Sequence, residues 1–128
     1  MSANNDPATQ FELAKQVLAH FISLDESLTD GRHIIHYFYG EPDTLPGLRT
    51  KLEGLGYLVR DTLTSPGLIA ETMGVTDEAW AESTMSLMCE LADEYDAEYD
   101  GWEASTVRQK PPKPTKKGLF RKLFGRTS

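Results

Sequence analysis

The sequence predicts an α+β fold in which a four-stranded antiparallel sheet carries helices on one face and an extra helix precedes the first strand. Three observations lead to this prediction. Helical and strand spacings of apolar residues alternate in the order helix, strand–helix–strand, strand–helix–strand. A right-handed crossover in each strand–helix–strand unit puts the first and third strands at the centre of the sheet, which is the ferredoxin-like arrangement. A length of 128 residues with 39% apolar content suits one domain with an ordinary core.

The N-terminal helix is predicted over residues 9–24, followed by a loop over residues 24–31. Thr9 with Glu12 has the form of a capping box, and Asp6 before Pro7 offers an alternative start. The apolar residues at helical spacing are Phe11, Ala14, Val17, Leu18, Phe21 and Ile22.

The first strand is predicted over residues 32–39, a β-branched and aromatic segment bounded by Gly31 and Gly40. Both of its faces are largely apolar, which favours a central position in the sheet. The second helix is marked by leucines at 45, 48, 52 and 55, with Pro46 in its first turn and Gly54 and Gly56 at its end.

The second half of the sheet follows from two strands around a Ser-Pro-Gly turn at residues 65–67. Residues 57–64 are predicted as a strand, and residues 68–72 form the weakest predicted strand. Thr76 is expected to cap the third helix, and residues 99–106 are expected to form the last strand. The predicted buried stripe of this helix is Trp80, Thr84, Leu87, Met88, Leu91 and Tyr95.

Charge is distributed very unevenly along the chain. All 20 acidic residues lie within residues 1–105, which hold only five basic residues and therefore carry a formal charge of −15. Residues 106–128 hold the other eight basic residues and no acidic one, which gives +8. We therefore expect an acidic domain over residues 1–106 and a basic Pro/Lys linker with a short amphipathic tail over residues 107–128. The acidic domain should repel phosphate backbones, so we expect it to bind no nucleic acid directly.

Several classes of protein are disfavoured by composition. No apolar run approaches the ~18 residues of a membrane-spanning helix. Residues 1–25 contain three acidic residues and no basic region before an apolar run, so we expect no secretory signal. The single cysteine, Cys89, is typical of a reducing environment, and we expect a cytoplasmic protein with a structural thiol beside Glu90.

Motifs that could carry chemistry are weak. Asp96, Glu98, Asp100 and Gly101 resemble the opening of a calcium loop, but the position that needs a bidentate acid is Val107. His33 and His36 are predicted to point to opposite faces of a strand and cannot share a metal ion, and His20 lies on a helix. We therefore expect that the protein is not an enzyme and that it binds no metal and no cofactor.

The C-terminal tail carries an amphipathic pattern. Leu119, Phe120, Leu123 and Phe124 share one side of a short predicted helix, and Arg121 and Lys122 lie opposite. A helix of about nine residues is unstable alone and needs a surface on which to form. Three surfaces remain open: an anionic membrane, an acidic partner groove, and the acidic domain of the same chain.

A family resemblance accounts for several short motifs. The run Tyr99-Asp100-Gly101-Trp102 is similar to the end of the domain in the regulator of ribonuclease activity B family, the ribonuclease E inhibitors. His36-Tyr37-Phe38 and Leu55-Gly56-Tyr57-x-Val59 resemble two further motifs of this family. The resemblance covers about residues 9–106 and implies a ferredoxin-like fold and a small acidic protein that binds ribonuclease E without catalysis. The basic tail departs from the acidic C-terminal extension of such regulators, and Gly101 also suggests a β-bulge beside a buried Trp102.

The predicted function is a cytoplasmic, non-catalytic regulator of RNA degradation that binds a protein partner, with ribonuclease E the leading candidate. The alternatives are a peripheral membrane-associated adaptor anchored by its tail and an immunity-type protein that neutralises a toxin by charge. The expected partner-binding residues are Glu78, Glu82, Asp93, Glu94, Asp96 and Glu98.

Overall fold

A single antiparallel sheet with the strand order β2-β3-β1-β4 organises the computed structural model, which describes residues 5–105. The elements are α1 (Pro7–Ser23), β1 (Gly31–Gly40), α2 (Leu45–Gly54), β2 (Leu58–Asp61), β3 (Gly67–Val75), α3 (Glu78–Glu94) and β4 (Ala97–Ala104). The predicted fold class is confirmed, and β1 and β3 are the central strands. The division at residue 106 into a domain and a tail stays a prediction.

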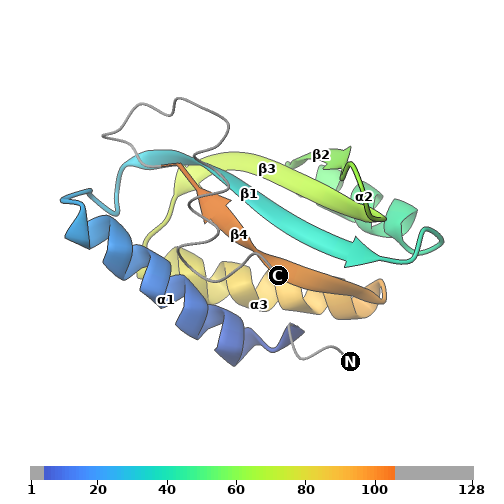
Figure 1. The fold of residues 1–128 in the computed structure, drawn as a ribbon, viewed down its shortest axis with the longest axis horizontal. Helices are drawn as coiled ribbons and strands as arrows, with labels where there is room; N and C mark the ends of the chain where they lie inside the picture. Colours follow the sequence, from blue (N-terminus) through green and yellow to red (C-terminus); the bar gives the residue numbers. More distant parts are fainter. Residues whose placement is uncertain (1–4, 106–128) are drawn as a thin grey trace.

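The helices form one layer and the sheet another (Figure 1). Helix α1 packs against α3, α3 packs on β4, and α2 packs on β2 and β3. All three helices contribute apolar side chains to one core with a single face of the sheet. The sheet face on the other side receives none of the described helices.

Helix α1 begins at the alternative start. The Asp6 carboxylate accepts hydrogen bonds from Thr9 N at 3.1 Å and from Thr9 Oγ1 at 2.6 Å, and Pro7 occupies the first turn. The predicted capping box is therefore wrong, and Glu12 pairs with Lys15 at 3.0 Å instead. Two hydrogen bonds to the cap hold the pKa of Asp6 below its ordinary value.

Helix α3 is capped one residue later than predicted. The Asp77 carboxylate accepts a hydrogen bond from Trp80 N at 2.8 Å, whereas the buried Thr76 hydroxyl has no hydrogen-bond partner within the described residues. The predicted stripe is right for Thr84, Met88 and Leu91. The helix also buries Ala81, Met85, Cys89 and Ala92, whereas Trp80, Leu87 and Tyr95 are half-buried.

The two strands around the turn have the opposite relative lengths from those predicted. Strand β2 covers only four residues, which pair with residues 68–71 of β3. Strand β3 covers nine residues because it pairs with β1 over its whole length, from Gly31 opposite Val75 to Tyr39 opposite Gly67. Strand β4 begins two residues earlier than predicted, directly after Asp96, whose positive φ of 55° turns the chain out of α3.

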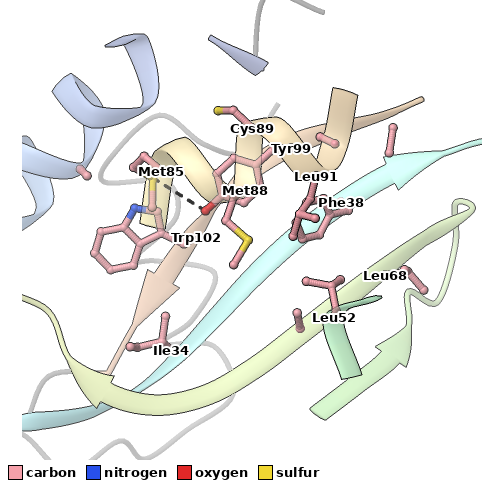
Figure 2. Packing of buried hydrophobic residues seen from close by; sticks show 14 of the residues in the cluster. Ile34, Phe38, Leu52, Leu68, Met85, Met88, Cys89, Leu91, Tyr99 and Trp102 are labelled. Atoms are coloured by element: carbon pink, nitrogen blue, oxygen red, sulfur yellow. Dashed lines mark hydrogen bonds between the residues drawn. The ribbon is translucent and has the colours of Figure 1, made fainter. Parts of the chain in front are cut away.

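The core fills the space between the helices and one face of the sheet. Figure 2 shows side chains from β1, β3, α2 and α3 meeting there, among them Phe38, Leu52 and Met88. Each of these three side chains has an exposed fraction of 0%, and burial of a side chain of this size contributes ~2 kcal/mol. Cys89 belongs to the same core, where burial, together with the charges of Asp93 and Asp6, raises the pKa of its thiol to about 12. The thiol is therefore a structural group.

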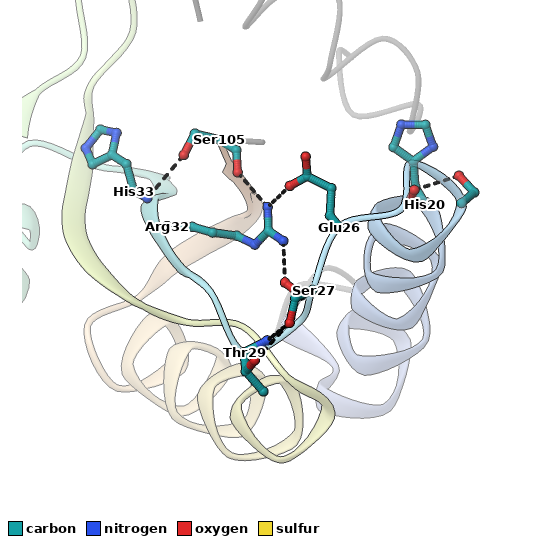
Figure 3. A network of polar contacts seen from close by, with 8 residues as sticks. His20, Glu26, Ser27, Thr29, Arg32, His33 and Ser105 are labelled. Carbon is teal, nitrogen blue, oxygen red and sulfur yellow. Dashed lines mark hydrogen bonds and ion pairs between the residues drawn. The ribbon is translucent and has the colours of Figure 1, made fainter. Parts of the chain in front are cut away.

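A buried ion pair closes the end of the sheet where β1 begins (Figure 3). Arg32 Nη1 donates to Glu26 at 2.9 Å and to the Ser105 carbonyl at 3.0 Å, and Arg32 Nη2 donates to the Ser27 carbonyl at 2.8 Å. The guanidinium also lies 4.0 Å from the centre of the Phe21 ring. One side chain thus ties α1, the loop after it and the end of β4 together.

Candidate functional site

Five of the motif residues that carry the family resemblance meet in one aromatic cluster on the helix side of the sheet. His36 lies directly opposite Trp102 on β4. Its ring centre is 5.7 Å from that of Tyr57 and 5.8 Å from that of Tyr99, and the rings of Phe38 and Tyr99 are 5.2 Å apart. These residues are distant in sequence, and together they join β1, β4 and the segment before β2.

His36 is held neutral inside this cluster. Its Nδ1 lies 2.8 Å from Tyr99 Oη, and within the described part of the chain its buried Nε2 has no hydrogen-bond partner. Complete burial lowers the pKa of His36 to about 3. A neutral imidazole enclosed by aromatic rings acts as a packing element, so His36 does not serve as a surface contact.

The run from Tyr99 to Trp102 forms the predicted β-bulge. Tyr99 pairs with Phe38 and Gly101 pairs with Tyr37, so Asp100 is the extra residue between two adjacent pairs. Gly101 has a φ of +99°, which strains any residue with a side chain, and Trp102 is 5% exposed. Gly56 has a φ of +101° where the chain leaves α2. The positive φ at both positions therefore explains why each motif has a glycine there.

The acidic residues lie elsewhere, on the outer side of α3 and just beyond its end. Helix α3 contains five exposed carboxylates and no basic residue: Glu78, Glu82, Glu90, Asp93 and Glu94. Asp93, Glu94 and Asp96 surround the C-terminal end of the helix, where the dipole favours positive charge. Each of these acids costs ~0.3–1 kcal/mol of stability there. Such a local conflict between charge and fold is typical of a binding surface.

A groove of about 700 Å³ opens at this end of α3. Its carboxylates come from three parts of the chain: Glu41 after β1, Asp93 and Asp96 at the end of α3, and Glu98 on β4. Asn5 fixes one wall, because its side chain bonds Asp93 at 2.9 Å and the backbone of Ala97 and Tyr99 at 2.9 and 2.8 Å. We call this feature the acidic groove.

The structure separates the six residues predicted to bind a partner. Asp93, Asp96 and Glu98 line the acidic groove, and Glu94 is exposed in the last turn beside it. Glu78 and Glu82 lie in the first turns of α3, about 16 Å or more from Asp93 at a rise of ~1.5 Å per residue. Sequence reasoning missed Glu41, because only the packing of β1 beside β4 brings it to the groove.

Residues 5–105 contain neither a cluster of side chains that could hold a metal ion nor a helix that could span a membrane. His33 and His36 do point to opposite faces, and no three His, Cys, Asp or Glu side chains in this range are placed to hold a metal ion. Within the same range, no helix is long and apolar enough to cross a bilayer. Val107 of the calcium-loop comparison and the tail residues 119–124 lie outside the described residues.

Comparison with known proteins gives one result. The family model described as regulator of ribonuclease activity B matches residues 12–104, a range that includes the aromatic cluster and the β-bulge. None of the curated proteins matches the chain significantly.

Proposed function

The chain belongs to the regulator of ribonuclease activity B family, and on this premise we propose that it is a non-catalytic regulator that binds ribonuclease E through the acidic groove. The match covers nearly the whole described domain, from α1 to the end of β4. The family's role is the regulation of a ribonuclease, a protein partner. The identity of the ribonuclease and the location of the binding site are the steps proposed here.

The acidic groove carries the proposal. Four carboxylates from three parts of the chain face a concave surface of a size that accepts several side chains of a partner. Lysine and arginine side chains complement such a surface, and arginine binds carboxylates through two parallel hydrogen bonds. Excess negative charge also speeds the encounter with a cationic protein segment. The same charge repels RNA, so binding the enzyme accounts for regulation better than binding the transcript.

The test is an affinity measurement between the full chain and ribonuclease E, with single charges removed from the groove. Asp96→Asn is the sharpest substitution, because asparagine accepts the positive φ of this position and only the charge is lost. An exposed charge pair contributes up to ~1 kcal/mol, so we expect binding to weaken about 3- to 5-fold at low salt. Asp96→Asn combined with Glu41→Gln should weaken it further.

Asp25→Asn is the matched control. Asp25 is likewise exposed and has a φ of +63°, but it follows α1 and does not line the groove. This substitution also removes one negative charge from a residue with a positive φ. Equal losses of affinity for Asp25→Asn and Asp96→Asn would show that only overall charge matters and would refute the groove as the binding site.

A further inference from the structure

We infer that the basic amphipathic segment of residues 116–125 docks on the helix-free face of the chain's own sheet, which we call the open face. Strand register defines this face, because side chains paired across a sheet point to the same side. Ile35 is opposite Glu71 on β3 and Glu103 on β4, and Tyr37 is opposite Ile69 on β3. Their neighbours along β1 point into the helix-packed core.

The centre of the open face is apolar. Ile35 is 2% exposed and Ile69 is 9% exposed, although both side chains point away from the three helices. Leu58 on β2 and Met73 on β3 extend the apolar area and are 69% and 68% exposed. A sheet face of this composition favours an apolar covering element.

The charges around this apolar centre are distributed asymmetrically. On the β2–β3 side, Glu71 is shared between Arg60 Nε at 2.5 Å and His33 Nε2 at 2.8 Å. Burial tends to raise the pKa of Glu71, but the hydrogen bonds from Arg60 and His33 outweigh it and lower the pKa. Strand β4 contributes Glu98, opposite Tyr39, and Glu103, opposite Ile35 and 4% exposed, to this face and no basic residue.

The segment that complements this face lies C-terminal to β4 in the sequence. Its four apolar residues share one side of the short helix that its sequence predicts, and residues 106–128 carry eight basic residues and no acid. A helix of this length needs a surface on which to form. The open face supplies both parts of that surface, apolar side chains at its centre and carboxylates along β4.

The chain geometry permits this docking. Ser105 is fixed beside the open face, because Ser105 N donates to the His33 carbonyl at 3.1 Å and Ser105 Oγ accepts from His33 N at 3.2 Å. Residues 106–115 are rich in proline and lysine and span about 31 Å when extended. An eight-residue strand is about 26 Å long, so the segment can reach any part of the face. Since Tyr39 and Glu98 belong to both surfaces, a docked segment borders the acidic groove.

The test uses the four isoleucines of the full chain as reporters. A nitroxide on Gly118→Cys is combined with labelled isoleucine methyl groups; buried Cys89, with its thiol pKa raised to about 12, stays unlabelled. We expect Ile35 and Ile69 to lose most of their signal intensity. Ile34 on the helix side and Ile22 on α1 should lose much less. Equal losses at all four positions, or the largest loss at Ile22, would overturn the inference.

Matched tail variants separate apolar docking from simple charge attraction. Leu123→Ser with Phe124→Ser keeps the charge and should restore the signals of Ile35 and Ile69. Arg121→Gln with Lys122→Gln keeps the apolar side and should restore them only in part. If the glutamine pair has the larger effect, attraction between charges explains the contact and the apolar docking is wrong.

Other occupants give different outcomes in the same experiment. In a mixture, one molecule carries the labelled isoleucine methyl groups and another carries the nitroxide. If the signal losses arise in this mixture, the segment binds a second copy. If no losses occur without vesicles and the nitroxide spectrum broadens only when vesicles of phosphatidylglycerol and phosphatidylcholine are added, the segment binds a lipid surface. Either result contradicts docking within one chain. No ribonuclease is present, so the outcome is independent of the proposed function.

Discussion

Lowering the pH from 7 to 5 should destabilise the domain, because the folded domain holds His36 in its neutral form. Burial lowers its pKa to about 3, against about 6.5 for a histidine in an unfolded chain. Between these two values the unfolded state binds a proton that the folded state does not bind, so acid favours unfolding. Linkage gives a loss of ~2 kcal/mol between pH 7 and pH 5 from this one side chain.

Urea unfolding at pH 7, 6 and 5 measures this loss. The interval from pH 7 to pH 5 lies above the pH values at which carboxylates titrate. Glu71, whose pKa is lowered in the folded state, contributes a separate loss of stability at more acidic pH. The imidazole resonances of His36 should stay those of the neutral form down to pH 5. Stability that does not change over this range, or a His36 that titrates near pH 6.5 in the folded state, would refute the reasoning.

Two substitutions test the motif residues in the same unfolding assay. Tyr99→Phe leaves His36 Nδ1 without its buried partner and should lower the free energy of unfolding by ~1–3 kcal/mol. Tyr57→Phe, whose hydroxyl makes no bond to His36, should lower it by well under 1 kcal/mol. Equal losses would contradict the role of the Tyr99 hydroxyl. Gly101→Ala should cost ~1–3 kcal/mol because of its positive φ, and Gly31→Ala, where an added methyl meets no atom, should be nearly neutral. A harmless Gly101→Ala would argue against backbone strain at the bulge.

Sequence periodicity predicted the order of the elements and the central position of β1. Both depend on local patterns: helical spacing in α1 and α3, and apolar residues on both faces of β1. Lengths and caps were less predictable. The extent of β3 depends on pairing with a strand distant in sequence, and the choice between the adjacent candidates Thr76 and Asp77 depends on the exact residue at which α3 begins.

The candidate site was predictable in type but not in arrangement. Charge composition indicated an acidic surface, and Asp93, Asp96 and Glu98 do line one groove. Glu41 could not be predicted, because it reaches the groove only through the packing of β1 beside β4. The motif residues His36, Tyr57 and Trp102 carry the family resemblance, yet their positions in the core identify them as determinants of the fold.

The most direct test of the central claim is the salt dependence of binding between the full chain and purified ribonuclease E. Screening is weak at low ionic strength, and the Debye length falls from about 30 Å at 0.01 M to about 10 Å at 0.1 M. The acidic groove predicts tight binding at low salt that weakens steadily as salt is added, with a smaller slope for Asp96→Asn. Absence of binding at low salt, or an affinity that salt does not change, would contradict an electrostatic interface.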